Sequence, residues 1–282
     1  MRTRKQSARG FVRKSKCLLL LTAMDKRSPS PSMLSKVPQV TLAFWIIKIA
    51  ATTLGETGGD ALSMTLKFGY AISTAIFFAF FVVTAAAQIA SSKLHRFLYW
   101  TVIVATTTVG TTTSDYLTRS AGLGYLKSSL LLFAMVLAVL AIWYFVLGSV
   151  NVNRITNRKA ETFYWLTILT SNTLGTALGD CLADTSGFGY ERGALVFGGA
   201  LVLIAALYFF TNFSHVTLFW AAFILTRPLG ATLGDILTKP VDDGGMNLSR
   251  FTSSYVIAAF MIICILVTSR KSEHDTASEQ QA

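Results

Sequence analysis

Charged side chains are scarce in this 282-residue chain, in which Asp, Glu, Lys and Arg together make up 14% of the residues. Soluble domains usually carry about 25% charged residues. Hydrophobic residues make up 52% of the chain, and 20 residues are phenylalanine. This composition excludes an ordinary water-facing globular domain and favours a protein embedded in lipid.

Cysteine and histidine are also rare, with three of each in the chain. Cys17, Cys181 and Cys264 form no C-x-x-C motif and have no suggestive spacing, which argues against a redox centre or a zinc site. A short apolar run, 18–23, follows the basic N-terminus, but it is too short for the core of a signal peptide. We therefore expect no cofactor and no enzymatic activity.

Apolar stretches of about 20 residues recur along the whole chain, and such a stretch can cross a hydrocarbon core of about 30 Å. They predict an all-α membrane protein with eight transmembrane helices. The expected spans are about 39–66, 71–90, 96–118, 126–148, 161–183, 192–211, 215–238 and 251–269.

An internal repeat organises these spans. Each repeat has Phe or Tyr followed by Trp, then Gly ten residues and Asp fifteen residues after the Trp, and a further Gly nine residues after the Asp. A motif helix and a plainer helix in each repeat form a helical hairpin, so the four repeats should run parallel. The tryptophans, expected to anchor the helices at the membrane interface, are Trp45, Trp100, Trp165 and Trp220.

These features divide the chain into a basic N-terminal tail, an eight-helix membrane domain and a polar C-terminal tail. The tail at 1–36 is expected to be disordered, and Met24 and Met33 both offer alternative starts. The membrane domain covers 37–269 and the C-terminal tail covers 270–282. The expected repeats are about 37–93, 94–158, 159–213 and 214–269.

Lysine and arginine predict the orientation. Seventeen lie in the terminal tails and the loops between repeats, against six in the loops within repeats. The positive-inside rule then places both termini in the cytoplasm of a multi-pass protein in a bacterial plasma (inner) membrane. The six in the loops within repeats are Lys67, Arg119, Lys127, Arg192, Lys239 and Arg250.

The repeated aspartate is expected inside the hydrocarbon layer. At 1.5 Å per residue, the fifteen residues from Trp to Asp cover about 22 Å of helix. A charged side chain at the bilayer centre costs roughly 2.5–3.5 kcal/mol, so four such acids need compensation. These residues, with one additional acid four residues before the first, are Asp60, Asp115, Asp180, Asp235 and Glu56.

Small residues four apart precede each aspartate, and this pattern lets helix backbones approach closely in lipid. We expect them to press each motif helix against a neighbour, with the acid beside the contact face. The packing residues are Gly55 with Gly59, Gly110 with Ser114, Gly175 with Gly179, and Gly230 with Gly234.

A polar stripe continues from each aspartate at steps of four residues, which keeps these side chains on one side of the helix. Four such stripes on parallel helices should line a shared cavity. Lys48 and Arg227 are the candidate counter-charges. The auxiliary polar residues are Thr52, Thr107, Thr111, Asn172 and Thr176.

At this depth five acidic groups face only two basic ones, so either some acids hold protons or a cation joins them. The oxygen-rich set of carboxylates, hydroxyls and one amide suits a proton or a hard cation such as Na⁺, Mg²⁺, Ca²⁺ or Mn²⁺. The identity of a bound metal is not predicted.

The pattern W-x9-G-x3-[GS]-D, repeated four times and opened by KVPQVTLAFWIIKIAATTLGETGGD, resembles a bacterial family of polytopic membrane proteins. That family is defined by four tandem copies of a repeat of unknown function. The resemblance covers about 33–270, and the chain departs from it in residues 1–32 and in Ser114. It implies the fold and the membrane, and carries no activity.

The first functional hypothesis is a transporter of a small hard cation, or of a proton-coupled solute, that uses intramembrane carboxylates. The alternative is a structural or accessory membrane protein whose acids stabilise helix packing. A weaker alternative is an intramembrane aspartyl hydrolase, because ALGD and TLGD faintly resemble the motif of such proteases. The expected partners are membrane lipids and the small cation or proton, with no nucleic acid, and a homo-oligomer is compatible with the pattern.

Overall fold

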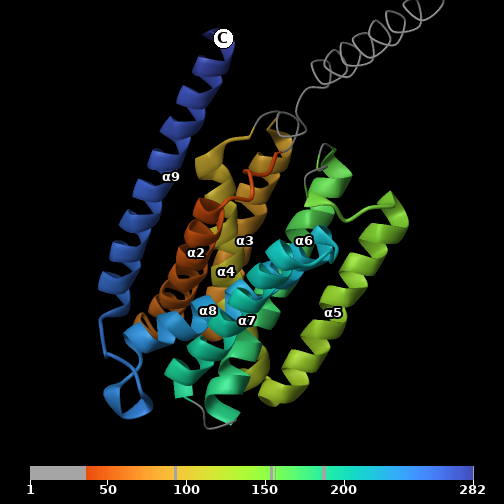
Figure 1. Ribbon diagram of the computed structural model, residues 1–282. Helices are drawn as coiled ribbons and strands as arrows, with labels where there is room; N and C mark the ends of the chain where they lie inside the picture. The colour runs from red at the N-terminus through yellow and green to blue at the C-terminus, as the bar shows by residue number, and fades with distance from the viewer. Residues whose placement is uncertain (1–35, 92–93, 153–154, 156, 186–188, 282) are drawn as a thin grey trace, which may run out of the picture.

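The computed structural model describes residues 36–281, apart from 92–93, 153–154, 156 and 186–188, and it places eight long α-helices in these ranges (Figure 1). Each expected apolar segment is a helix, and the predicted 1–36 tail lies outside the described residues except for its last residue. The helices are α2 (Leu42–Asp60), α3 (Gly69–Ala90), α4 (Arg96–Asp115), α5 (Gly124–Leu147), α6 (Arg158–Asp180), α7 (Gly189–Phe210), α8 (His215–Thr238) and α9 (Arg250–Gln281).

The four motif helices, α2, α4, α6 and α8, form a closed inner ring. Each packs against the motif helix of the next repeat, and α8 packs against α2. The ring therefore joins the first repeat to the last without a covalent connection.

The outer helices, α3, α5, α7 and α9, cover this ring in a regular order. α3 packs on α4, α5 on α6, α7 on α8, and α9 on α2. Each outer helix therefore packs mainly on the motif helix of the following repeat. The expected hairpin, in which the two helices of one repeat would pack on each other, is wrong in this respect. This exchange ties neighbouring repeats together around the whole ring.

The junctions between motif and outer helices explain the glycine that follows each aspartate. In the first three repeats the α-helix ends at the aspartate and continues as a π-helical turn, over Ala61–Thr65, Tyr116–Ser120 and Cys181–Thr185. The later glycine has a positive φ in every repeat, a conformation that favours glycine because it has no Cβ. These φ angles are 74° at Gly69, 72° at Gly124, 70° at Gly189 and 82° at Gly244.

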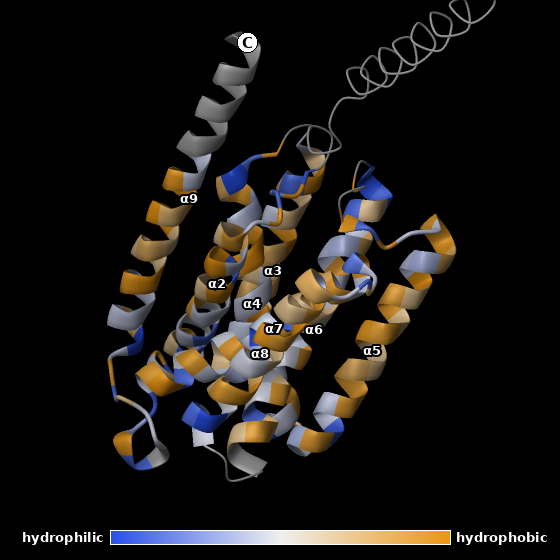
Figure 2. Cartoon of the chain, viewed as in Figure 1, coloured by the Kyte–Doolittle hydropathy of each residue, from blue (hydrophilic) through white to orange (hydrophobic). Residues whose placement is uncertain are grey.

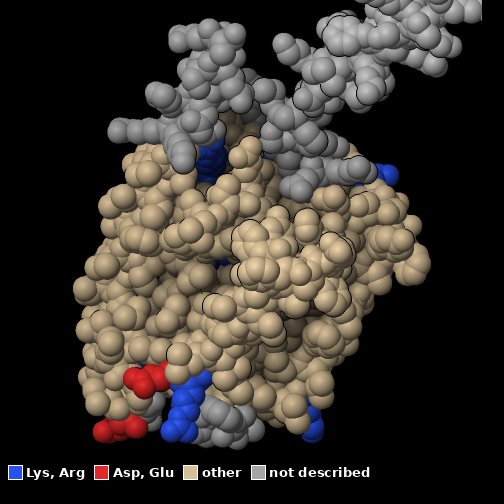
Figure 3. Space-filling model, in the orientation of Figure 1, with Lys and Arg blue, Asp and Glu red and all other residues tan. Residues whose placement is uncertain are grey.

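The outer surface is apolar, and the chain is an integral membrane protein. Five helices in the described part of the chain are long and apolar enough to cross a membrane: α3, α5, α7, α8 and the Arg250–Ser269 part of α9. Large apolar side chains such as Phe145, Phe209 and Phe210 are at least 77% exposed. Hydrophobic colours predominate on the outer helices α5 and α9 where they are described (Figure 2). Charged side chains on the visible face lie mostly at its two ends (Figure 3).

The repeated aromatic pairs form a girdle inside one end of the ring. The Phe or Tyr of each repeat contacts the Trp of the next at 5.4–6.2 Å between ring centroids, and Phe219 contacts Trp45 at 5.8 Å. Trp100, Trp165 and Trp220 are buried. These three residues therefore bind helix to helix, and the expectation that they anchor the protein at the lipid interface is wrong.

Candidate functional site: a charged axis inside the helix ring

The first glycine of each motif sets the distance between neighbouring inner helices. A Cβ on this glycine would overlap the residue that stands seven positions after the Trp of the next repeat. The geometry is cyclic, because the glycine of the fourth repeat meets the first repeat. The pairs are Gly55 with Thr107, Gly110 with Asn172, Gly175 with Arg227, and Gly230 with Thr52.

The second small residue of the motif repeats this packing one turn further along. A Cβ at Gly59 would lie 3.1 Å from the side chain of Thr111, and a Cβ at Gly234 would lie 2.8 Å from the Cβ of Glu56. Gly179 faces the Ala231 Cβ at 3.4 Å. These glycines therefore lie where neighbouring inner helices approach closely.

Hydroxyl and amide groups join the inner helices across these close contacts. Thr107 Oγ1 donates to the Ala51 carbonyl at 3.2 Å, and Thr52 Oγ1 donates to the Thr226 carbonyl at 3.3 Å. Asn172 is the equivalent residue of the third repeat, and its Nδ2 donates to Thr106 Oγ1 at 2.9 Å. A buried polar side chain that makes such bonds avoids the cost of an unmet hydrogen bond.

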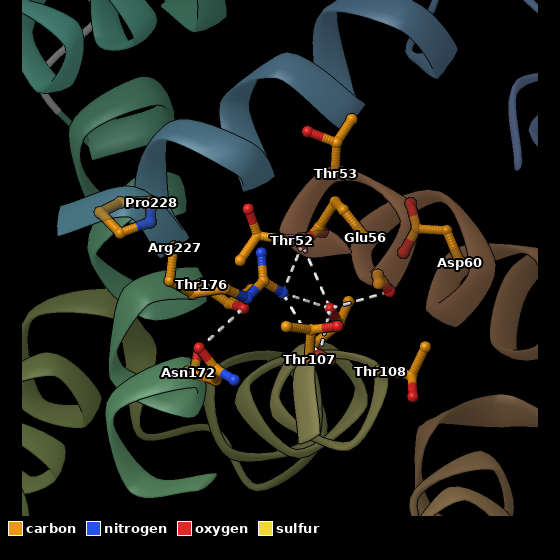
Figure 4. Close-up of polar contacts among 12 residues, drawn as sticks. Thr52, Thr53, Glu56, Asp60, Thr107, Thr108, Asn172, Thr176, Arg227 and Pro228 are labelled. Atoms are coloured by element: carbon orange, nitrogen blue, oxygen red, sulfur yellow. Dashed lines mark hydrogen bonds and ion pairs between the residues drawn. The ribbon is translucent and has the colours of Figure 1, made fainter. Parts of the chain in front are cut away.

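Arg227 and Glu56 form an ion pair in the middle of the axis (Figure 4). Arg227 extends from α8, and its Nη2 donates to Glu56 Oε2 at 2.9 Å and to the Thr107 carbonyl at 3.4 Å. The same nitrogen donates to Thr111 Oγ1. Arg227 is 0% exposed, so this pair lies entirely within protein.

Lys48 lies on the same side of the axis, one helical turn before Thr52. Its Nζ donates to Asn172 Oδ1 at 3.3 Å and lies 4.2 Å from the centre of the Phe223 ring. Lys48 is 0% exposed. We name Lys48 and Arg227 the cation level of the axis.

The four repeated aspartates form a carboxylate level at the other end of the axis, and two basic residues bridge them in pairs. Arg119 lies 3.3 Å from an oxygen of Asp115 and 3.7 Å from an oxygen of Asp180. Lys239 lies 3.3 Å from Asp235 and 3.5 Å from Asp60. Each bridge crosses one interface of the ring, α4 with α6 in the first case and α8 with α2 in the second.

A third basic residue, Arg250 at the start of α9, lies 3.6 Å from an oxygen of Asp60. Lys239 stands directly after α8. Burial lowers its pKa, but the carboxylates of Asp235 and Asp60 outweigh that effect, so the pKa of Lys239 lies above its ordinary value. Lys239 therefore stays protonated at neutral pH.

Three of the acids also lie close enough to share a ligand. One carboxylate oxygen from each of Glu56, Asp60 and Asp235 lies within 4.8 Å of the others, and all three residues are buried. Carboxylate oxygens suit hard cations. Lys239 and Arg250 occupy the same neighbourhood, so a metal ion here would compete with the protein's own cations.

The sequence matches the family described as Repeat of Unknown Function (DUF347) in four tandem copies, over residues 43–93, 98–148, 163–214 and 218–273. The chain belongs to this family. No curated protein and no solved structure was found to match it.

The four DUF347 repeats carry all the predicted site residues to the interior of the ring. Every predicted acid, counter-charge and auxiliary polar residue is at most 4% exposed. The structure brings Glu56, Asp60 and Asp235 together, and pairs Asp115 with Asp180 through Arg119. Thr176 lies on the axis, and among the described residues it donates only to the carbonyl of Asn172 in its own helix, at 3.5 Å.

One expectation about the axis is wrong. The excess of three negative charges disappears because Arg119, Lys239 and Arg250 approach the aspartates. Some residues of the polar stripes contact one another directly, as Arg227 does with Thr107 and Thr111. An apolar groove does occur, but it lies on the outside between α2 and α9, next to Ile46 and Phe260.

Two basic residues of the site could have been recognised from their position in the sequence. Arg119 and Lys239 each stand four residues after a motif aspartate, a spacing that places two side chains on one face of a helix. Counting both residues with the loops within repeats overlooks this spacing. The pattern occurs only in the second and fourth repeats, because the equivalent positions in the first and third are Met64 and Asp184.

Proposed function

We propose that this protein is a membrane transporter whose buried carboxylates take up and release a proton or a small hard cation. One observation supports it most: ion-paired acids and bases fill the axis of a closed helix ring surrounded by apolar helices. Intramembrane charges are costly and typically mark ion pathways and proton relays. The carboxylate level contains the primary acids, Asp60 with Glu56, and the remaining aspartates complete the site.

The bridged pairs suggest how such a site would work. Lys239 contacts two aspartates at 3.3 and 3.5 Å, and Arg119 contacts two at 3.3 and 3.7 Å. Arg119 is the one cation that bridges Asp115 and Asp180 in the described residues, and it cannot fully neutralise two carboxylates in a low-dielectric interior, so one carboxylate of this pair favours a proton or a metal cation. Movement of Arg119 between its two partners would then release that ion, and Lys239 and Arg250 would compete with a cation at Asp60.

The same ion pairs also favour the alternative of a structural or accessory protein. Basic residues of the chain itself compensate the acids, and buried pairs of this kind can fix the register of helices. In that case the charges would hold α2 against α8 and α4 against α6 without any ion moving. The two functions differ in whether loss of one carboxylate abolishes flux or stability.

We further propose that all eight helices cross the membrane and that both termini face the cytoplasm of a bacterial inner membrane. α2, α4 and α6 fall short of the apolar composition of the other five because their polar faces point to the axis, yet they pack beside α8 in the ring. Arg119, Lys239 and Arg250 lie next to aspartates. Of the six lysines and arginines counted on the side opposite the cytoplasm, the remaining three are Lys67, Lys127 and Arg192. The excess of basic residues on the cytoplasmic side is therefore larger than the first count gives.

The test is a set of single Asp→Asn variants at the four motif positions, reconstituted in liposomes that contain a pH-sensitive dye. Gradients of Na⁺, Mg²⁺, Ca²⁺ and Mn²⁺ are imposed in turn, and proton movement is recorded. The matched control is Asp242→Asn, because Asp242 lies exposed in the loop between α8 and α9. A transporter should lose flux in the motif variants while its folded yield stays near that of the control.

The opposite pattern would identify the structural function. In that case Asp→Asn variants would lose folded yield and thermal stability, and the wild-type protein would show no gradient-dependent proton movement with any of the four cations.

A further inference from the structure

The pair of Asp60 and Asp235 contacts two cations. Lys239 bridges the two carboxylates at 3.5 and 3.3 Å, and Arg250 lies 3.6 Å from Asp60. Lys239 directly follows α8, and Arg250 is the first residue of α9, the outer helix that packs on α2. Two carboxylates therefore meet two positive charges, so both acids can remain ionised while these cations stay in place.

The pair of Asp115 and Asp180 contacts one cation in the described part of the chain. Arg119 lies 3.3 Å from Asp115 and 3.7 Å from Asp180. The helix α5 packs on α6 as α9 packs on α2, but α5 begins with Gly124 where α9 begins with Arg250. The described part of α5 thus brings no second cation to this pair, and one negative charge is left over if both acids are ionised.

The carboxyl group of Asp180 also has an oxygen atom without a hydrogen bond. Asp180 is 3% exposed, and its Oδ2, the oxygen nearest Arg119, is buried and has no hydrogen-bond partner among the described residues. The undescribed stretch nearest in the chain, 186–188, contains no lysine or arginine. An oxygen left unbonded in protein costs far less on a neutral carboxyl than on a carboxylate, because burial of an uncompensated charge is strongly unfavourable.

We infer that Asp115 and Asp180 hold one proton between them at neutral pH, and that Arg119 compensates the one charge that remains. Two carboxylates held together in a buried site can share a proton, because both cannot easily be ionised side by side. A metal cation would need several oxygen ligands, and among the described residues the cluster of acids close enough to supply them lies around Asp60.

The other ionisable groups near this pair do not provide the missing positive charge. Tyr70 of α3 and Tyr125 of α5 act on Arg119, and the Tyr70 hydroxyl accepts a hydrogen bond from its Nη1 at 3.4 Å. Of the charged groups that act on the two aspartates from α2 and α8, Lys239 is the one cation, and it bridges the other pair. The groups from α2 and α8 are Glu56, Asp60, Asp235 and Lys239.

This inference rests on the proposed function and names its ion as a proton. The side chain of Arg119 is 30% exposed, whereas Asp115 and Asp180 are each 3% exposed. Arg119 is therefore the one member of the group with substantial access to solvent, and a proton would enter and leave the pair beside it.

The test is infrared spectroscopy of the purified full-length protein in detergent at neutral pH, in water and in heavy water. A protonated carboxyl has a carbonyl band that a carboxylate lacks, and this band shifts to lower frequency in heavy water. Wild type should show the band. Asp115→Asn and Asp180→Asn should each remove the same contribution, because the remaining carboxylate then has Arg119 to itself. The matched control is Asp242→Asn, which removes an exposed acid and should leave the band unchanged.

Arg250→Gln provides the converse test. It leaves Lys239 as the one described cation between Asp60 and Asp235, which is the arrangement that Arg119 has in the other pair. This second pair should then take up a proton, so the band should grow by about the contribution that each asparagine variant removes. The result does not depend on the stability of the aspartate variants.

The inference is overturned if wild type lacks the band, if the contribution survives in Asp115→Asn or Asp180→Asn, or if Arg250→Gln adds nothing. A band that appears only after addition of a chelator would also reject it, because a metal cation would then occupy the pair. Flux is not measured, so the outcome is separate from the liposome test. The band without proton movement would preserve the proton site and reject transport, whereas cation-dependent flux without the band would reject the proton site alone.

Discussion

Arg227 Nη2 lies 2.9 Å from Glu56 Oε2, and this pair joins the last motif helix to the first. At the positions equivalent to Glu56 the other repeats have Thr111, Thr176 and Ala231. The charge pair is therefore specific to the α8–α2 interface, the one interface of the inner ring between repeats that are not consecutive in the chain. Lys239 adds a second bridge there, between Asp235 and Asp60.

Replacement of Glu56 alone should destabilise the α8–α2 interface more than replacement of Glu56 and Arg227 together. Glu56→Gln leaves Arg227 buried without its carboxylate, and breaking a buried pair in this way costs about 3–5 kcal/mol. The double variant Glu56→Gln with Arg227→Met should recover much of this loss, because it removes both charges. Thermal unfolding of the purified proteins measures both effects, and Asp242→Asn provides the exposed-acid control.

If the double variant is as unstable as Glu56→Gln alone, the hydrogen bonds of Arg227 to Thr107 and Thr111 stabilise the ring, and the ion pair itself is of minor importance. That result would contradict the inference that the Glu56–Arg227 ion pair holds α8 against α2.

Gly230 should tolerate no side chain. A Cβ at this position would overlap Oγ1 and Cβ of Thr52, where α8 and α2 approach most closely. Gly230→Ala should therefore separate the two helices and lower the melting temperature, as overpacking in a tight contact usually costs about 1–3 kcal/mol.

Gly198→Ala is the matched control for this glycine. Gly198 lies within α7 and a Cβ there would meet nothing within 4 Å, so alanine should be neutral or stabilising by about 0.5–1 kcal/mol through helix propensity. Equal effects of the two substitutions on the melting temperature would refute close packing at the inner ring.

The helices and the inward stripe could be predicted from the sequence because both depend on local periodicity. Apolar runs determine helix positions, and steps of four place Glu56 and Asp60 on one face. The four-fold repeat also allowed the contact glycines to be identified, since Gly55 and its equivalents recur at one fixed distance from the Trp.

The pairing of elements could not be predicted, because it depends on contacts between residues far apart in the chain. A repeat pattern does not distinguish an outer helix that packs on its own motif helix from one that packs on the next. The partners of Arg119 and Lys239 depend on which helices are neighbours in the ring, so the charge balance was also missed. The tryptophans were misassigned because their position near a helix end suits both an interfacial anchor and a buried girdle.

The buried girdle predicts weak contact between native tryptophans and lipid. Trp100, Trp165 and Trp220 are buried, whereas Phe145 on α5 is 84% exposed. In liposomes that contain brominated lipids, native fluorescence should be quenched only by the contribution of Trp45, which is half-buried, because bromine quenches on contact. Phe145→Trp should add a component that is strongly quenched, and this variant leaves the girdle intact. Quenching of most of the wild-type fluorescence would place Trp100, Trp165 and Trp220 in lipid and contradict the girdle.

The parallel ring predicts that the two ends of the bundle face opposite sides of the membrane. Ser149, between α5 and α6, and Met246, between α8 and α9, are both exposed in loops, and they lie at opposite ends because an odd number of helices, α6, α7 and α8, separates them. We expect Met246→Cys, in a background without Cys17, Cys181 and Cys264, to react with a membrane-impermeant maleimide added to intact cells. Ser149→Cys should react only after the membrane is opened, because the lysines and arginines place its loop in the cytoplasm. Labelling of both cysteines in intact cells would show that α6, α7 and α8 do not all cross the membrane, whereas the reversed pattern would keep the spans and invert the protein.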